Sequence, residues 1–156
     1  MQPPCCGHMS GMTITEQRYR ITRSALYSIV TNPVSYPQWL VGTKKIREVS
    51  PGWPEPGSWF KHTVGFGPLA IPDRTTVRAV HRDEMLELLV RARPAIEAIV
   101  RFDIEDAPGG SVLRMTETPV GVHRLLAPLM QPLIRRRNER SLQRLKEFSE
   151  RPVEFV

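Results

Sequence analysis

Apolar and polar residues alternate along most of the chain between Thr13 and Thr118. A period of two is the pattern of β-strands that bury one face. The alternation predicts strands over residues 13–21, 44–50, 58–66, 69–81, 85–92, 95–106 and 111–118. The turns at Arg82-Asp83 and Pro108-Gly109-Gly110 are too short to hold a crossover helix. We therefore expect one antiparallel sheet of about six or seven strands.

Helical spacing appears between the first two predicted strands. Apolar residues lie three and four positions apart from Ala25 to Val30, and Ser24 could cap that helix. The Asn32-Pro33 pair should end it, because proline breaks a helix and restricts the residue before it. A second short helix is expected over residues 36–40.

A long helix is predicted at the end of the chain, over residues 122–149. Its apolar positions recur at spacings of three and four, and they are Leu125, Leu126, Leu129, Met130, Leu133, Ile134, Leu142, Leu145 and Phe148. Pro128 and Pro132 should kink it or delay its start. At a length of roughly 40 Å, this helix can cross the sheet and cover its apolar face.

The length of the chain, 156 residues, suits one domain with a sizeable core. Residues 1–12 contain Pro, Gly and Ser without periodicity, so we expect a disordered tail there, a domain over 13–150 and a short tail over 151–156. No window approaches about 18 uncharged apolar residues, and the first residues lack the pattern of a secretory signal. We therefore expect a cytoplasmic protein.

The formal net charge is +6, and much of the positive charge falls in the last predicted helix. Its arginines are Arg135, Arg136, Arg137, Arg140 and Arg144, interleaved with Glu139, Glu147 and Glu150. The favoured interpretation is the solvated face of an amphipathic helix. Peripheral contact with a membrane surface stays open as an alternative, whereas nucleic acid is not expected as a partner.

Four segments, in order along the chain, carry a family likeness. They are ALYSIVTNPVSYPQWL, PGWPEPGSWF, GFGPLAIPDRTTVRAV and RLLAPLMQPLIRRRNERSLQRLKEF. Over about residues 13–150 the chain thereby resembles the START-like superfamily (SRPBCC, birch-pollen-allergen-like), in particular its polyketide cyclase/dehydrase and lipid-transport branch. The resemblance implies an α+β helix-grip fold, in which a curved antiparallel sheet wraps around a long C-terminal helix and encloses a cavity for an apolar ligand. It implies no universal catalytic triad, because this fold carries several functions.

The inward positions of the strands and of the last helix should line that cavity. The candidate ligand-binding residues are Trp39, Phe60, Val64, Thr75, Leu88, Val90, Ala98, Val100, Phe102, Met115, Leu126, Met130 and Ile134. Trp39 is expected near the mouth. Plain core packing is the competing explanation for every apolar member.

His62, Asp73 and Glu117 are the polar residues on these inward faces that could carry chemistry. A tight turn at Gly67-Pro68 would set His62 opposite Asp73 on the neighbouring strand. A histidine beside a carboxylate can act as a general base near neutral pH, but a purely structural polar pair is the favoured explanation. Glu117 would need an arginine, a water cluster or a ligand hydroxyl as its partner.

The leading hypothesis is a carrier or sensor that binds an apolar small molecule, such as a lipid, an isoprenoid or a polyketide-like compound. The alternative is a cyclase, aromatase or dehydratase on the same scaffold, with His62 and Asp73 or Glu117 as acid and base. A second alternative is a non-enzymatic interaction protein that uses the Arg-rich last helix.

Cys5, Cys6 and His8 lack a fourth ligand nearby, and no phosphate loop or nucleophile elbow is present, so neither a metal nor a cofactor is expected. The oligomeric state is left open.

Overall fold

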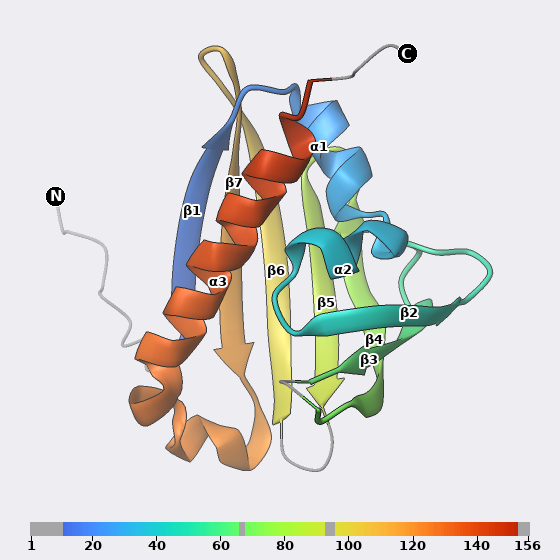
Figure 1. Ribbon diagram of the computed structural model, residues 1–156, viewed down its shortest axis with the longest axis vertical. Coiled ribbons are helices and arrows are strands. Elements are labelled where there is room, and N and C mark those ends of the chain that lie inside the picture. Colours follow the sequence, from blue (N-terminus) through green and yellow to red (C-terminus); the bar gives the residue numbers. More distant parts are fainter. Residues whose placement is uncertain (1–10, 66–67, 93–95, 153–156) are drawn as a thin grey trace, which may run out of the picture.

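Seven strands form one curved antiparallel sheet in the computed structural model, which describes residues 11–65, 68–92 and 96–152 (Figure 1). The strands are β1 (Thr13–Tyr19), β2 (Thr43–Val49), β3 (Trp59–Val64), β4 (Ile71–His81), β5 (Met85–Ala92), β6 (Ile96–Ala107) and β7 (Gly110–Pro119). Their order across the sheet is β1-β7-β6-β5-β4-β3-β2. The predicted sheet is confirmed, and each strand begins and ends within two residues of its predicted bounds.

The β3–β4 hairpin has the predicted register. Its opposed pairs include Val64 with Ile71, His62 with Asp73 and Phe60 with Thr75. Register shifts interrupt the ladders between β2 and β3 and between β4 and β5. Bulges of this kind bend a strand and increase its twist, so they curve the sheet on the side that carries β2 to β5.

Two α-helices and one 3-10 turn connect β1 to β2, as α1 (Arg23–Val30), η1 (Pro33–Ser35) and α2 (Tyr36–Trp39). The cap of α1 is Thr22 and not the predicted Ser24, since the Thr22 hydroxyl accepts the N–H of Ala25 at 3.2 Å. Thr22 has the extended backbone that a capping residue needs, whereas Ser24 already lies inside the helix. Asn32 caps the η1 turn through its side-chain oxygen.

Trp39 lies in the core and not near a cavity mouth, which corrects the sequence-based prediction. Its side chain is fully buried, and its ring makes edge contacts with Tyr36 and Phe102 at centroid distances of 5.4 and 6.1 Å. The indole N–H donates to the hydroxyl of Ser35, one turn earlier, at 3.0 Å. Because that hydrogen bond satisfies the polar end locally, the whole side chain can be buried.

The last helix, α3 (Ala127–Ser149), follows a 3-10 turn, η2 (Gly121–Leu125), and runs across one face of the sheet (Figure 1). The predicted delay of the helix start is confirmed: Pro128 falls in the first turn and Pro132 lies inside the helix. Pro128 fits there because the first N–H groups of a helix have no intrahelical partner. None of the helices in the described ranges is long and apolar enough to span a membrane.

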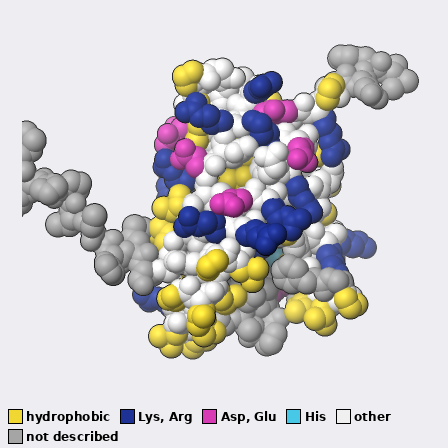
Figure 2. All heavy atoms as spheres, turned by 60° about the vertical axis from the view of Figure 1, so that its left-hand side comes forward, with side chains coloured by type: hydrophobic (Ala, Val, Ile, Leu, Met, Phe, Trp, Pro, Cys, Tyr) yellow, Lys and Arg dark blue, Asp and Glu magenta, His cyan; other side chains and the backbone are white. Residues whose placement is uncertain are grey.

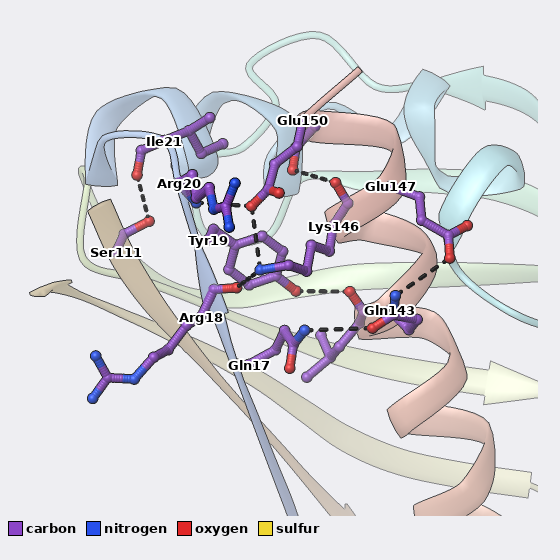
Figure 3. Close-up of polar contacts among 12 residues, drawn as sticks. Gln17, Arg18, Tyr19, Arg20, Ile21, Ser111, Gln143, Lys146, Glu147 and Glu150 are labelled. Atoms are coloured by element: carbon purple, nitrogen blue, oxygen red, sulfur yellow. Dashed lines mark hydrogen bonds and ion pairs between the residues drawn. The ribbon is translucent and has the colours of Figure 1, made fainter. Parts of the chain in front are cut away.

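The end of α3 is fastened to β1 by hydrogen bonds (Figure 3). The Tyr19 hydroxyl donates to the carbonyl of Leu142 at 3.0 Å, and Lys146 Nζ donates to the carbonyl of Arg18 at 2.8 Å. The N–H of Arg20 donates to the Glu150 carboxylate at 2.8 Å, which lowers the pKa of that carboxyl. The first and last parts of the domain are thereby held together.

Before β1, Gly11 is buried, and a Cβ at this position would approach the Cβ of Ala127 to 3.2 Å. Gly11 and Met12 belong to the predicted tail, residues 1–12; residues 1–10 of that tail and the last four residues, 153–156, lie outside the described part of the chain.

Candidate functional site: a cavity beneath the last helix

A cavity of about 320 Å³ lies between the sheet, the residues that follow α2, and α3. Most of its lining is apolar, with Tyr36, Leu40, Val41, Phe60, Val64, Ile71, Leu88, Val90, Ala98, Val100, Phe102 and Met115. The other lining residues are Gly42, Thr43, His62, Gly65, Thr75, Glu117 and Arg137. A mostly apolar concave surface with a few placed polar groups is the composition of small-molecule sites.

The strand alternation explains why the sheet supplies most of this lining. Phe60, His62 and Val64 are every second residue of β3 and share one face. Where the cavity wall leaves β3, Gly65 allows a close backbone approach, since a Cβ there would lie 1.7 Å from the carbonyl oxygen of Leu69. Any side chain at position 65 would therefore displace the start of the β3–β4 connection.

Glu117, near the end of β7, is buried and paired from above by α3. Its carboxylate accepts from the Arg137 guanidinium in an ion pair, and from Asn138 Nδ2 at 3.0 Å. Arg137 also donates to Asn138 Oδ1, so the three side chains form one connected cluster. The sequence analysis expected an arginine as one of three partners for a buried Glu117, and Arg137 fills that place. Glu117 and Arg137 of this cluster form a charged part of the cavity wall.

His62 is the second polar element of the lining, and it is only 3% exposed. Its Nε2 lies 3.0 Å from the Thr75 hydroxyl, while its Nδ1 is buried without a hydrogen-bond partner in the described part of the chain. Burial lowers the pKa of His62; the charge of Asp73 opposes this shift and that of Arg47 adds to it. The imidazole is therefore neutral at neutral pH, with one nitrogen committed to Thr75 and the other free to bind a further group.

Asp73 lies opposite His62 on β4, as predicted, but it is not among the lining residues. Its carboxylate accepts the N–H of Arg74 at 2.6 Å. The side-chain hydrogen bond of His62 goes to Thr75, two residues further along β4. Asp73 thus acts on His62 as a nearby charge and not as the partner of its free nitrogen.

The cavity gathers most of the residues selected from the sequence. Those that line it are Phe60, His62, Val64, Thr75, Leu88, Val90, Ala98, Val100, Phe102, Met115 and Glu117. Those that lie outside its lining are Trp39, Asp73, Leu126, Met130 and Ile134. Leu126 is half exposed at the start of α3, and Met130 and Ile134 are partly buried there. The strands therefore lie as alternation predicts, whereas the first turns of α3 contribute less than predicted.

Several lining residues were missed, chiefly Tyr36, Leu40, Val41, Thr43 and Arg137. The segment around residues 40–43 has no periodic signal, so only the tertiary structure places it over the cavity. Arg137 did carry a signal, because it is in helical phase with Met130 and Ile134 on the inward side. The inward position of Glu117 in turn predicted that a cation was needed.

No group of three or more metal-ligating side chains occurs within the ranges that the structure describes. Cys5, Cys6 and His8, considered above as weak metal ligands, lie outside those ranges. The described residues form a mainly apolar chamber that holds a buried imidazole nitrogen without a hydrogen-bond partner and an ion pair.

No family model and no curated protein matches the sequence. Solved structures do match the fold. Protein CV1439 from Chromobacterium violaceum superposes with a TM-score of 0.73 at 12% identity, covering 91% of this chain and 99% of that one. Ara h 8.0201 gives a TM-score of 0.68 at 14% identity, covering 88% and 96%. The di-domain ARO/CYC StfQ from the steffimycin biosynthetic pathway gives 0.71 at 12% identity, covering 90% of this chain and 50% of that one. The chain therefore has the START-like helix-grip fold, as the resemblance implied.

Proposed function

We propose that this protein binds an apolar small molecule in the cavity beneath α3, as a carrier or a sensor. The observation that carries the proposal is the cavity itself, about 320 Å³ with a mainly apolar lining. Protein interiors are otherwise close-packed, so a cavity of this size leaves the side chains of its wall without protein contacts on one side. A ligand that fills the space restores those contacts, since pockets of about 300 Å³ and above can enclose small molecules.

The polar lining suggests what else the ligand carries. The free Nδ1 of His62 needs a partner, because a buried polar atom without a hydrogen bond is costly. A neutral imidazole can donate or accept at this atom, according to which nitrogen holds the proton. A ligand hydroxyl can bond to Nδ1 in either tautomer, because it both donates and accepts. A ligand carbonyl can do so only when Nδ1 carries the proton. We therefore expect an apolar molecule with at least one oxygen group, such as a lipid, isoprenoid or polyketide-like compound.

Enzymatic turnover of such a ligand is a second candidate function. His62 supports it, because a neutral imidazole on a cavity wall can accept a proton from a bound substrate. The similarity to the di-domain ARO/CYC StfQ is compatible with this candidate but extends only to the fold. Glu117 is a poorer candidate for this role, since its carboxylate is engaged by Arg137 and Asn138.

Ligand binding can be tested with a fluorophore that brightens in apolar surroundings, after native mass spectrometry of the freshly purified protein has revealed any bound molecule. Val100→Trp places a large side chain in the cavity and should weaken fluorophore binding by tenfold or more. Ile99→Trp is the matched control, because Ile99 neighbours Val100 on the same strand but is not a lining residue. Absence of both a bound molecule and fluorophore binding in the wild type would contradict the proposal.

His62→Gln separates the binding function from the enzymatic one. If His62 only positions the ligand, the variant should lose affinity for an oxygen-bearing ligand, and the wild type should show no turnover. If His62 is catalytic, turnover should vanish in the variant while affinity stays within a few-fold. Thr75→Val is the companion variant, because it removes the hydroxyl that holds Nε2 and keeps the side-chain shape.

A further inference from the structure

The start of the last helix exposes a group of large apolar side chains. Val122, Leu125, Leu126, Leu129 and Leu133 are exposed by 74%, 84%, 52%, 82% and 68%. We call these five residues the apolar patch. Scattered apolar residues on a surface are ordinary, but a contiguous group of this kind marks an interaction site. Figure 2 shows apolar side chains gathered at the lower end of the molecule, where η2 and α3 begin.

Arginines continue the same stripe of the helix. Leu126, Leu129 and Leu133 follow one another at spacings of three and four, and Arg136 and Arg140 extend that spacing. Both arginines are exposed, and neither forms an ion pair with a carboxylate of the described ranges. One face of α3 is thus apolar over its first turns and basic over the next.

The apolar patch lies at the end of the sheet where the cavity is. Because the sheet is antiparallel, the end of β3, the start of β4 and the end of β7 meet at one edge (Figure 1). Val64, Ile71 and Glu117, which line the cavity, come from these strand ends. The β3–β4 connection adds Leu69, which is 69% exposed, to the same edge.

We propose that this end of the molecule docks on the surface of an anionic lipid bilayer. The apolar patch would enter the boundary between head groups and acyl chains, and Arg136 and Arg140 would meet the negative head groups. Interfacial amphipathic helices bind membranes in this way: the burial of their apolar side chains and the attraction of their basic side chains to anionic lipid both favour binding. Docking goes beyond ligand binding in the cavity and does not depend on the ligand.

A bilayer fits this surface better than the other occupants that an apolar face could take. In a two-fold dimer with parallel helices, the arginines of the two copies would face one another, and like charges repel; with antiparallel helices, the arginines would lie at opposite ends and stay in water without a partner. A nucleic acid would use the arginines and leave the leucines in water. A bilayer with anionic lipid satisfies both halves of the stripe at once.

Vesicle flotation tests the proposal on the full-length protein. The vesicles contain phosphatidylcholine with about a third phosphatidylserine, or phosphatidylcholine alone. The wild type should bind the anionic vesicles and bind the neutral ones weakly. Leu129→Ser with Leu133→Ser should lower the partition coefficient by at least about tenfold, because two leucines no longer enter the bilayer. Arg136→Glu should lower it by about fivefold or more on anionic vesicles only.

Matched controls come from outside the apolar patch. Val34→Ser changes an apolar residue that is as exposed as Leu133, at 68%, but lies on η1. Arg82→Glu reverses an exposed charge in the β4–β5 turn, at the other end of the sheet. Both controls should bind like the wild type, and all variants should keep the wild-type melting temperature because the changed side chains are exposed.

Three outcomes would overturn the proposal. One is no wild-type binding to either kind of vesicle. Another is binding that the leucine pair leaves unchanged, which would place the contact elsewhere. The third is a concentration-dependent dimer that the leucine pair dissociates while no vesicle is bound, which would make the patch an interface between two copies. Analytical ultracentrifugation of the same samples detects that dimer.

Discussion

The two halves of α3 differ in what they contact, although they belong to one continuous helix. In residues 138–149, the side chains of Leu142 and Leu145 are at most 1% exposed, and hydrogen bonds fasten this half to β1 (Figure 3). In residues 127–137, Leu129 and Leu133 face water, and Arg137 reaches the cavity wall. The second half therefore holds the fold together, and the first half is available for function.

The difference follows from what lies beneath each half. Below the second half, Tyr19, Leu113 and other core side chains fill the space against the sheet. Next to the first half, the sheet and the segment after α2 leave a cavity, and Arg137 is the residue of this half that lines it. Functional sites commonly lie where packing is incomplete, because a ligand must take the place of a side chain. The two halves can be told apart by substitution.

The largest effect is expected from truncating a leucine in the packed half. Leu145→Ala should lower the free energy of unfolding by about 2–5 kcal/mol, because it leaves a cavity among side chains that cannot fully collapse. Leu133→Ala is the matched change in the other half, and it should cost less than about 0.5 kcal/mol because its side chain is exposed. Urea unfolding of the two variants measures both. Equal losses would show that the halves do not differ.

The ion pair between β7 and the first half of α3 should give the next largest effect. Arg137→Leu leaves the buried Glu117 with Asn138 as its one remaining side-chain partner among the described residues. A fully buried pair would cost about 3–5 kcal/mol to break, but 32% of the Arg137 side chain is exposed and water screens the charge. We therefore expect a loss of about 1–3 kcal/mol, measured by urea unfolding.

A double variant shows how that loss arises. Glu117→Leu with Arg137→Leu should recover much of the stability, because no unpaired charge is left in the cavity wall. Arg136→Leu is the control on the neighbouring position, where no described carboxylate pairs with the arginine, and it should change little. A double variant that is less stable than Arg137→Leu would mean that the pair itself stabilises the fold.

Strand alternation predicted much of this architecture, and tertiary packing decided the rest. The register of β3 and β4 and the inward position of His62 follow from the alternation of apolar and polar residues, because a shift of one residue would turn the apolar side chains of a strand to the opposite face. The facing of α3 does not follow in this way. Asn138 and Ser141 are fully buried while Leu129 and Leu133 are exposed, so hydrophobicity alone selects the wrong stripe. Likewise, a tryptophan in a short helix suits either a core or a cavity mouth, and its burial here depends on tertiary contact with Phe102 and on the hydrogen bond to Ser35.

A smaller effect is expected at the hydrogen bond that ties β1 to the packed half. Tyr19→Phe removes the hydroxyl that donates to Leu142 and keeps the ring in place. The carbonyl of Leu142 then loses a buried partner, so the free energy of unfolding should fall by about 1 kcal/mol. Hydrogen exchange should report the loss as faster exchange in residues 138–149 and not over the cavity. A uniform change along the helix would contradict a division into two halves.

The smallest effect, and the one that isolates the cavity, is the pH dependence contributed by His62. Burial keeps its folded-state pKa below the ordinary value of 6.5, to which it returns when the chain unfolds. Well above pH 6.5 the imidazole is neutral in both states and contributes no pH dependence. As the pH falls through this value, the unfolded chain takes up a proton that the folded chain resists, so stability declines until the folded pKa is passed. The wild type should therefore lose more stability than His62→Gln between about pH 7.5 and 5.5.

His81→Gln changes an exposed histidine at the end of β4 and should behave like the wild type. Melting curves of the three proteins over this pH range test the prediction. Identical pH profiles for wild type and His62→Gln would show that the imidazole is hydrated, and the cavity would then be wetter than its apolar lining indicates.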